Sequence, residues 1–152
     1  MMNRRKALGL LVAVPAATLI ARPAFAMTPE IYTRRGVAVR GTDVVAYFTQ
    51  SEPVRGSREF TTQWKDAEWR FSTAEHLAMF EDDPEAYAPQ YGGWCAWAVS
   101  RNYTAATIPP AWTIYEGKLY LNATLPTRRT WEQDIPGNIA RADANWPSVL
   151  NS

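Results

Sequence analysis

The stretch that decides the fold is Phe60-Thr61-Thr62-Gln63-Trp64-Lys65-Asp66-Ala67-Glu68-Trp69-Arg70-Phe71. Apolar and polar side chains alternate over residues 60–64 and 68–71, which is the pattern of half-buried β-strands. Residues 65–67 between them predict a short loop, so the whole stretch is interpreted as a β-hairpin. A helix is expected directly afterwards, because Ser72 or Thr73 can cap its first turn, with Glu75 near the capping-box position.

A second hairpin is predicted farther along the chain, where residues 112–115 and 118–122 flank the turn Glu116-Gly117. Helices are predicted at residues 73–82, 84–87, 94–100, 127–133 and 138–145, and Pro136-Gly137 is expected to separate the last two. For residues 94–100, which follow the diglycine, a buried strand is the alternative to the favoured helix. The pattern indicates a small single domain of the α+β class, with two antiparallel hairpins in one sheet and several short helices.

The first 26 residues have the pattern of an export signal. A positively charged start, Arg4-Arg5-Lys6, precedes an apolar run over residues 8–20 and a small-x-small cleavage site at Ala24-Phe25-Ala26. The adjacent arginines favour the twin-arginine type, with an ordinary secretory signal as the alternative. The sequence therefore predicts cleavage after Ala26, the twin-arginine export machinery as a partner, and a soluble product that is periplasmic or secreted.

The rest of the chain is predicted to hold an irregular lead-in over residues 27–36 and one domain over residues 37–152. Four of the 16 basic residues and none of the 15 acidic ones lie in the signal, so residues 27–152 have a formal charge of −3. This balance does not suggest a nucleic-acid or anionic-membrane surface. No second apolar segment is long enough to cross a membrane. We therefore expect no nucleic-acid partner and a protein that is not embedded in a membrane after cleavage.

Several stretches of the chain form a recognisable set: residues 40–48, 69–75, 117–122, 131–132, 135–139 and Asp83-Pro84-Glu85-Ala86-Tyr87-Ala88-Pro89-Gln90-Tyr91-Gly92-Gly93-Trp94-Cys95-Ala96. Through them, residues 37–147 resemble the exported YHS-domain proteins of bacteria, some of which are selenoproteins. The resemblance implies a link to metal handling, because related modules occur in heavy-metal transporting ATPases and beside some di-iron hydroxylases. The family as a whole has no well-defined activity.

The resemblance also implies where this chain departs from its metal-binding relatives. Those relatives carry cysteines at the positions that Ala46 and Ser72 occupy here. A soft-metal site needs thiolate or imidazole ligands, so the metal site of the wider family is not carried over whole. Cys95, the only cysteine, corresponds to a position where some relatives carry selenocysteine, which implies redox or soft-ligand chemistry.

Cys95 is therefore the centre of the candidate site, and three hypotheses follow. The first is a soft-metal binding module, most simply for copper, with Cys95 as the thiolate ligand and His76 or Met79 as the second ligand. The second is a thiol redox enzyme acting on peroxide or partner disulfides, for which Cys95 is the catalytic residue. The third is a non-catalytic interaction domain with a buried thiol. A binding role is preferred, and the first two hypotheses imply a periplasmic metal-handling or thiol partner.

The residues around Cys95 are candidates for lining the site. Tyr91, Trp94 and Trp97 predict either an aromatic-lined cleft or a cluster in the core. The diglycine Gly92-Gly93 predicts a sharp turn or a close approach of the backbone to another group.

Asp43 and Tyr47 are the other candidate lining residues, because they share a face if the segment between them is one helical turn. Asp43 is expected either to cap that helix or to point into the site beside Cys95. His76, the only histidine, is expected to be an exposed helix residue if it is not a ligand.

Overall fold

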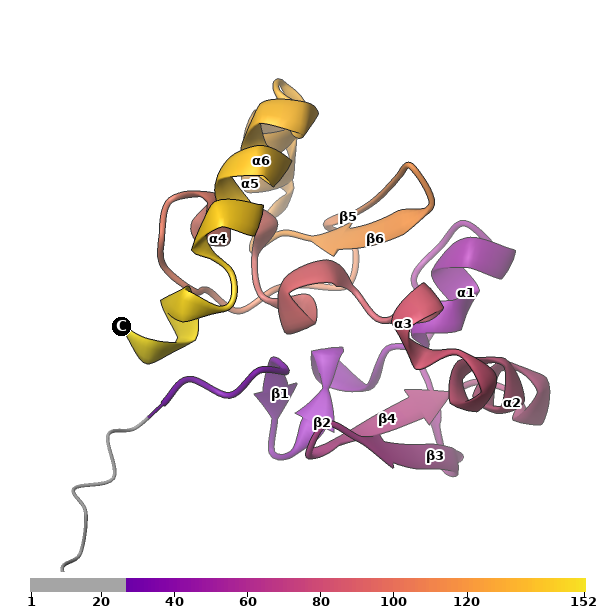
Figure 1. Cartoon of the computed structure of the whole chain (residues 1–152). Coiled ribbons are helices and arrows are strands. Elements are labelled where there is room, and N and C mark those ends of the chain that lie inside the picture. Colours follow the sequence, from indigo (N-terminus) through magenta and orange to yellow (C-terminus); the bar gives the residue numbers. More distant parts are fainter. Residues whose placement is uncertain (1–26) are drawn as a thin grey trace, which may run out of the picture.

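A mixed four-stranded sheet forms the lower layer of the domain in Figure 1, which shows the computed structural model. The structure describes residues 27–152, and the predicted signal peptide lies outside these residues. The strands lie in the order β1 (Thr33–Arg34), β2 (Val37–Ala38), β4 (Ala67–Phe71) and β3 (Ser57–Trp64). The β3–β4 pair is antiparallel, with Thr62 opposite Trp69, so the prediction of a hairpin here is confirmed.

The sheet also uses residues that precede this hairpin. β1 pairs antiparallel with β2, and β2 pairs parallel with β4 through Val37 and Glu68. The turn between β1 and β2 is fixed by the backbone N–H of Glu68, which donates to the carbonyl of Gly36 at 2.9 Å. Part of residues 27–36, expected to be an irregular lead-in, therefore belongs to the sheet.

The second predicted hairpin is present as β5 (Trp112–Tyr115) and β6 (Lys118–Leu121), which pair antiparallel. It forms a separate two-stranded sheet, so the prediction of one shared sheet was wrong. The reason lies in β6, where Leu119 and Leu121 enter one hydrophobic cluster and Tyr120 enters another. Both faces of β6 are covered by side chains, and the hairpin lies between the two clusters.

Short helices and turns occupy most of the remaining chain. The helices are α1 (Val44–Thr49), α2 (Ala74–Asp82), α3 (Pro84–Tyr87), α4 (Ala96–Ser100), α5 (Leu125–Glu132) and α6 (Ile135–Asn145). The 3-10 turns are η1 (Val39–Gly41), η2 (Gln90–Gly93) and η3 (Ser148–Asn151). As predicted, Thr73 caps α2 and Pro84 lies in the first turn of α3. Among residues 27–152, no helix combines the length and apolar character needed to cross a membrane.

The helix predicted after the diglycine is present as α4, and the turn before it is η2, in which Tyr91 (φ 59°) and Gly92 (φ 63°) have left-handed backbone conformations. The last predicted helix has a different boundary in the structure. Pro136-Gly137 does not break a helix, because both residues lie in the first turn of α6. There the missing N–H of proline has no cost, and Asp134 accepts the N–H of Gly137 at 3.1 Å.

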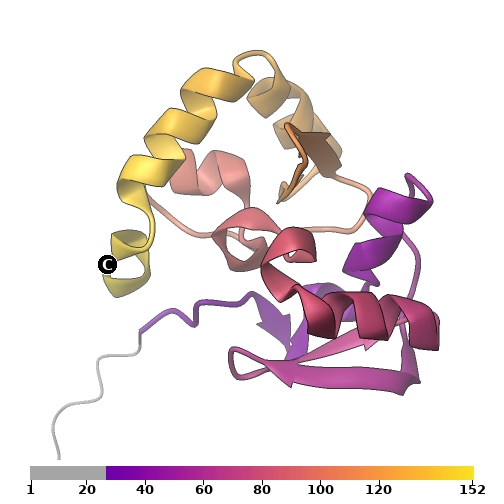
Figure 2. The same cartoon turned by 45° about the vertical axis from the view of Figure 1, so that its right-hand side comes forward.

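The buried side chains form two hydrophobic clusters. The first lies against the β1–β4 sheet and includes Trp69, Phe71 and Phe80. The second lies among η2, α4, α5 and α6 and includes Trp131. Figure 2 shows α6 arching over the upper part of the molecule, away from the sheet. Trp94 packs against both clusters and so contributes to the boundary between them.

Residues 28–32, which we call the N-terminal strap, join the two clusters. The N–H of Tyr32 donates to the carbonyl of Gly92 at 2.8 Å, and the ring N–H of Trp94 donates to a strap carbonyl at 3.0 Å. Gly92 lies so close that a Cβ on it would be 1.7 Å from the carbonyl oxygen of Glu30. The prediction that the diglycine serves a turn or a close backbone approach is confirmed, and Gly92 does both.

Replacing Gly92 by alanine should destabilise the domain strongly. The new Cβ would meet the carbonyl oxygen of Glu30, and alanine also resists the φ of +63°. Gly117→Ala is the matched control, because Gly117 has a φ of +76° but no atom within 4 Å of a Cβ. In urea unfolding we expect a loss of about 1 kcal/mol for the control and more than about 3 kcal/mol for Gly92→Ala. Equal losses would contradict the role of the strap contact.

Candidate functional site

Asp43 is a fully buried carboxylate at the start of α1. Its Oδ1 accepts the backbone N–H groups of Val45 at 3.0 Å and Ala46 at 3.1 Å, which confirms Asp43 as the N-cap. Its Oδ2 accepts the N–H of Ser72 at 2.8 Å and the hydroxyl at 2.6 Å, and lies 2.7 Å from Nδ1 of His76. Because a buried charge requires hydrogen-bond partners, Asp43 ties α1 to the β4–α2 connection.

This network includes the two positions that the resemblance assigns to family cysteines. Ala46 and Ser72 each donate to the carboxylate of Asp43. No group of three or more His, Cys, Asp or Glu side chains within residues 27–152 is arranged to hold a metal ion. The carboxylate of Asp43 therefore has a structural role here, and it contacts His76 instead of Cys95.

His76 is buried, so the expectation of an exposed helix residue was wrong. α2 packs against α1 and the β3–β4 hairpin, which turns His76 inward. Nδ1 faces the carboxylate of Asp43, and Nε2 lies 3.1 Å from the hydroxyl of Thr49. Both ring nitrogens have partners, so metal coordination by His76 would require the loss of a hydrogen bond.

Cys95 is also buried, with 1% of its surface exposed, at the N-cap position of α4. Its Sγ lies 3.5 Å from Oδ1 of Asn122 and accepts the N–H of Ala123 at 3.3 Å. Burial raises the pKa of the Cys95 thiol, and the nearby backbone N–H groups oppose this only in part. The thiol is therefore protonated and shielded from solvent at neutral pH, which favours the hypothesis of a buried thiol.

The structure does not bring the proposed metal ligands together. The side-chain partners of His76 are on α1, whereas those of Cys95 follow β6. Met79 is partly buried and packs against the first hydrophobic cluster. A copper site shared by Cys95 with His76 or Met79 stays a prediction that these contacts do not support.

The aromatic candidates around Cys95 likewise have separate partners. The hydroxyl of Tyr91 donates to Asp143 at 2.9 Å, and the ring of Trp94 packs against the N-terminal strap. Trp97 lies beneath the guanidinium of Arg101, which is 4.2 Å from the ring centroid. These contacts favour the interpretation of core and surface packing over a cleft around the thiol.

Tyr47 is buried in α1 and faces a different part of the chain. Its hydroxyl donates to the carbonyl oxygen of Pro109 at 2.8 Å, and its ring packs against Trp112. Burial raises the pKa of Tyr47 well above its usual range, so the hydroxyl remains a donor at neutral pH. Tyr47 thus holds the loop at Pro109 and does not contact Cys95.

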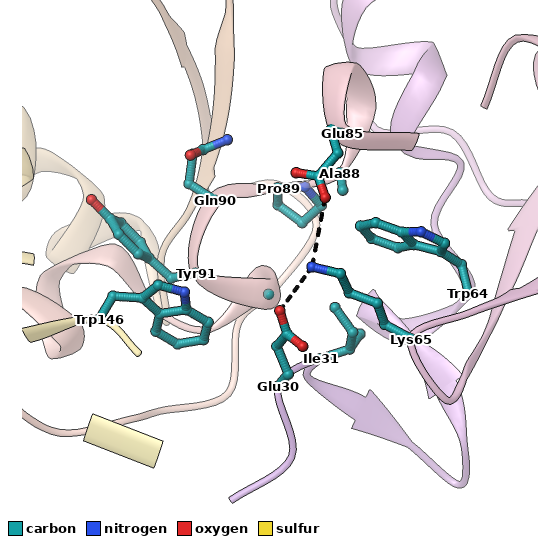
Figure 3. Close-up of a pocket in the computed structure, with 11 residues that line it drawn as sticks. Glu30, Ile31, Trp64, Lys65, Glu85, Ala88, Pro89, Gln90, Tyr91 and Trp146 are labelled. Carbon is teal, nitrogen blue, oxygen red and sulfur yellow. Dashed lines mark hydrogen bonds and ion pairs between the residues drawn. The ribbon is translucent and has the colours of Figure 1, made fainter. Parts of the chain in front are cut away.

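A small pocket of about 120 Å³ lies between the two clusters, with Trp64 and Trp146 at its border (Figure 3). Lys65 reaches across it, with Nζ 2.8 Å from Oε1 of Glu30 and 3.7 Å from Oε1 of Glu85. The hydrogen bond to Glu30 raises the pKa of Lys65, so the ammonium remains charged. Lys65 pairs with both carboxylates that line this pocket, so none of its three charged side chains lacks a partner.

A larger depression, of about 520 Å³, lies on the β1–β4 sheet and is lined almost entirely by arginines. They are Arg34, Arg35, Arg40, Arg55, Arg58 and Arg70. Arg70 pairs with Glu68 at 2.8 Å, whereas the other five take part in none of the ion pairs found among residues 27–152. Half of the twelve basic residues in this part of the chain therefore surround one hollow, with a single acidic partner. We call it the arginine depression.

Left-handed backbone turns bring several of these arginines to the depression. Arg35 (φ 52°) and Gly36 (φ 81°) connect β1 to β2. η1 consists of three successive left-handed residues, Val39 (φ 43°), Arg40 (φ 62°) and Gly41 (φ 77°). The left-handed backbone conformation costs roughly 1–2 kcal/mol for a residue with a side chain. Strain of this kind is concentrated at functional sites.

Close backbone contacts at Gly56 bring the segment that carries Arg55 next to the segments that carry Arg40 and Arg70. The N–H of Gly56 donates to the carbonyl of Gly41 at 2.8 Å, and the adjacent Arg55 forms a β-bridge with Thr42. A Cβ on Gly56 would lie 2.5 Å from the carbonyl oxygen of Arg70, so only glycine permits this approach. The arginines therefore converge from separate chain segments through contacts that few other residues could make.

This depression was not predicted, because net charge does not show how charged residues are distributed over the fold. The acidic excess of residues 27–152 hides a local concentration of arginine. Two signals were available: the adjacent pair Arg34-Arg35, and the alternation in β4 that places Arg70 on the face opposite Trp69. Arg58 lies where β3 bulges between its paired positions, and a bulge redirects a side chain in a way that alternation does not predict.

Comparison with protein-family models, curated proteins and solved structures gives no significant match. The resemblance to the exported YHS-domain proteins therefore stays a prediction from the sequence.

Asp43→Asn should destabilise the domain more than the loss of an ordinary helix cap. The amide nitrogen of the variant would face the donors of Ser72 and His76, so we expect a loss of about 2–4 kcal/mol. Thr124→Ala is the control, because it removes the exposed cap of α5 and should cost about 1 kcal/mol. Urea unfolding compares the two variants. A loss for Asp43→Asn no greater than that of the control would show that the network is dispensable.

Cys95 should react with an aromatic disulfide reagent only after the domain opens. Because burial shields the thiol and raises its pKa, we expect labelling at pH 8 to be at least about a hundredfold slower in the native protein than in urea. An exposed thiol on the same fold, Ala140→Cys combined with Cys95→Ser, is the control. Native labelling of Cys95 as fast as that of the control would restore the thiol hypotheses.

Proposed function

We propose that the chain is an exported, non-catalytic binding domain for a small, multiply charged anion. The observation that carries this proposal is the arginine depression, in which five of six arginines have no acidic partner among residues 27–152. Its volume of about 520 Å³ lies within the range of about 300–1,000 Å³ that small-molecule sites occupy. The export signal predicted for residues 1–26 supports the part of the proposal that places its action outside the cytoplasm.

The chemistry of arginine explains why an anion is the expected ligand. A guanidinium presents several N–H donors in a fixed plane, which match the oxygens of phosphate or carboxylate groups. Like charges gathered in a hollow also raise the local positive potential, and an anion relieves their mutual repulsion. Since Arg70 already has Glu68, the free binding capacity lies with the five other arginines.

A compact anion fits the depression better than a nucleic acid does. Single-stranded nucleic acids are bound by basic grooves that carry aromatic side chains for base stacking. The lining of the arginine depression contains no aromatic residue, and its only apolar member is Val37. Residues 27–152 also carry an acidic excess, which disfavours the long basic surface that a duplex needs.

The buried thiol gives the alternatives less support. Copper binding and thiol redox chemistry both require that a metal, peroxide or disulfide reaches Cys95. The low exposure of Cys95, its raised pKa and its separation from His76 all count against these two roles. The preference for a binding role over an enzymatic one is retained, with the binding site moved to the arginine depression.

The proposal predicts that pyrophosphate binds and that binding depends on the depression. In calorimetric titrations, Arg40→Gln and Arg55→Gln should each raise the Kd about tenfold, because each removes a charge-assisted hydrogen bond. Arg129→Gln is the matched control, because Arg129 is exposed on α5 outside the depression, and it should change the Kd by less than about twofold. Raising the salt concentration should weaken binding to the native protein.

Two results would overturn the proposal. One is the absence of pyrophosphate binding at millimolar concentration, and the other is an equal Kd for all three variants. Urea unfolding of the variants provides a check on folding. We expect Arg40→Gln and Arg55→Gln to be at least as stable as the native protein, because both reduce repulsion among like charges.

A further inference from the structure

A second depression adjoins the arginine depression and shares three of its side chains. Its volume is about 400 Å³, and Arg34, Arg40 and Arg55 belong to both. The rest of its lining is mostly apolar and comes from loops, namely Pro53, Val54, Pro109 and Thr42. The shared arginines therefore lie between a strongly basic end and an apolar end.

The apolar end is held in place by buried groups. The N–H of Asp43 donates to the carbonyl of Val54 at 2.8 Å, so the loop is fixed next to the cap of α1. The hydroxyl of Tyr47 donates to the carbonyl of Pro109 at 2.8 Å and fixes the opposite side. Asp43 and Tyr47, the candidate lining residues predicted on α1, thus support the apolar wall of this second depression.

We infer that the ligand is a phosphate monoester that carries a small apolar group, with the phosphate among the shared arginines and the apolar group against Val54. This inference rests on the proposed anion-binding function and names its ligand class. A phosphate monoester has a charge of about −1.5 to −2 at pH 7 and three terminal oxygens, which several guanidinium groups can share. A single carboxylate has one charge and two oxygens in a plane, and would leave more of the arginines unmatched.

Binding of inorganic phosphate, phenyl phosphate and benzoate separates these contributions. We expect phenyl phosphate to bind about tenfold more tightly than inorganic phosphate, because its ring is transferred from water to the apolar wall. Benzoate should bind more weakly than phenyl phosphate, because it has the ring but a smaller charge. Arg40→Gln should weaken phenyl phosphate and inorganic phosphate alike.

Variants of the apolar wall test the ring contact. Val54→Asn should reduce the advantage of phenyl phosphate over inorganic phosphate to less than about threefold, with the affinity for inorganic phosphate unchanged. Val54 is partly buried, so Pro53→Ser, at an exposed position, provides a second variant with the same expected direction. Urea unfolding establishes that both variants are folded.

Vesicles distinguish a free ester from a lipid headgroup with the same chemistry. The probes are phosphatidylcholine vesicles with and without phosphatidic acid, which is a phosphate monoester with an apolar part. Selective binding to phosphatidic acid that Val54→Asn and Arg40→Gln both weaken would support the inference with a lipid as the source. Binding of phenyl phosphate without vesicle binding would support it with a soluble ester as the source.

Failure of the inference differs from failure of the proposed function. If inorganic phosphate, pyrophosphate and phenyl phosphate bind equally and all depend on Arg40, the anion site stands and the apolar contact is overturned. If benzoate binds as tightly as phenyl phosphate, the assignment of a phosphate group is overturned. If no multiply charged anion binds, both proposals fall together.

Discussion

The close approach of Gly92 to the carbonyl of Glu30 is the constraint on which the two halves of the domain depend. The first cluster lies on the β1–β4 sheet and the second lies among the later helices, and the N-terminal strap runs between them. A side chain at position 92 would separate strap and turn, since its Cβ would overlap the carbonyl oxygen. The diglycine ahead of Cys95 is thus explained by packing, and its presence gives no argument for an exposed thiol.

Asp43 holds together the segments around the first hydrophobic cluster through polar contacts. Its carboxylate fixes the start of α1, the end of β4 and the ring of His76, while its backbone N–H fixes the loop at Val54. A buried carboxylate with this many donors holds its surroundings rigidly, because movement of any one segment leaves a charge unsatisfied. The contact at Val54 also brings this network next to the arginine depression, because Arg55 follows Val54 in the sequence.

Local features of the fold could be predicted from the sequence, whereas features that depend on distant contacts could not. The hairpin at residues 60–71 follows from the alternation of its own side chains, and the cap at Thr73 follows from its position before an apolar stripe. The separation of the two sheets depends on Tyr120 entering a different cluster from its neighbours, which alternation alone does not reveal. In the same way, the sequence left the burial of Cys95 open, because a helix start can expose or enclose a thiol. The arginine depression was missed because left-handed turns and the contact at Gly56 assemble it from separate segments.

The free domain carries an arrangement that costs stability, and this cost is an argument for a ligand. Glu52 and Glu59 are exposed in the same part of the chain, yet neither pairs with an arginine of the depression among residues 27–152. The repulsion among the guanidinium groups remains, and the left-handed conformation of Val39 adds strain beside them. An anion would offset the repulsion and would stabilise the folded state by binding it selectively. The five exposed guanidinium groups without acidic partners among residues 27–152 are therefore the reason that an anion is the ligand we propose.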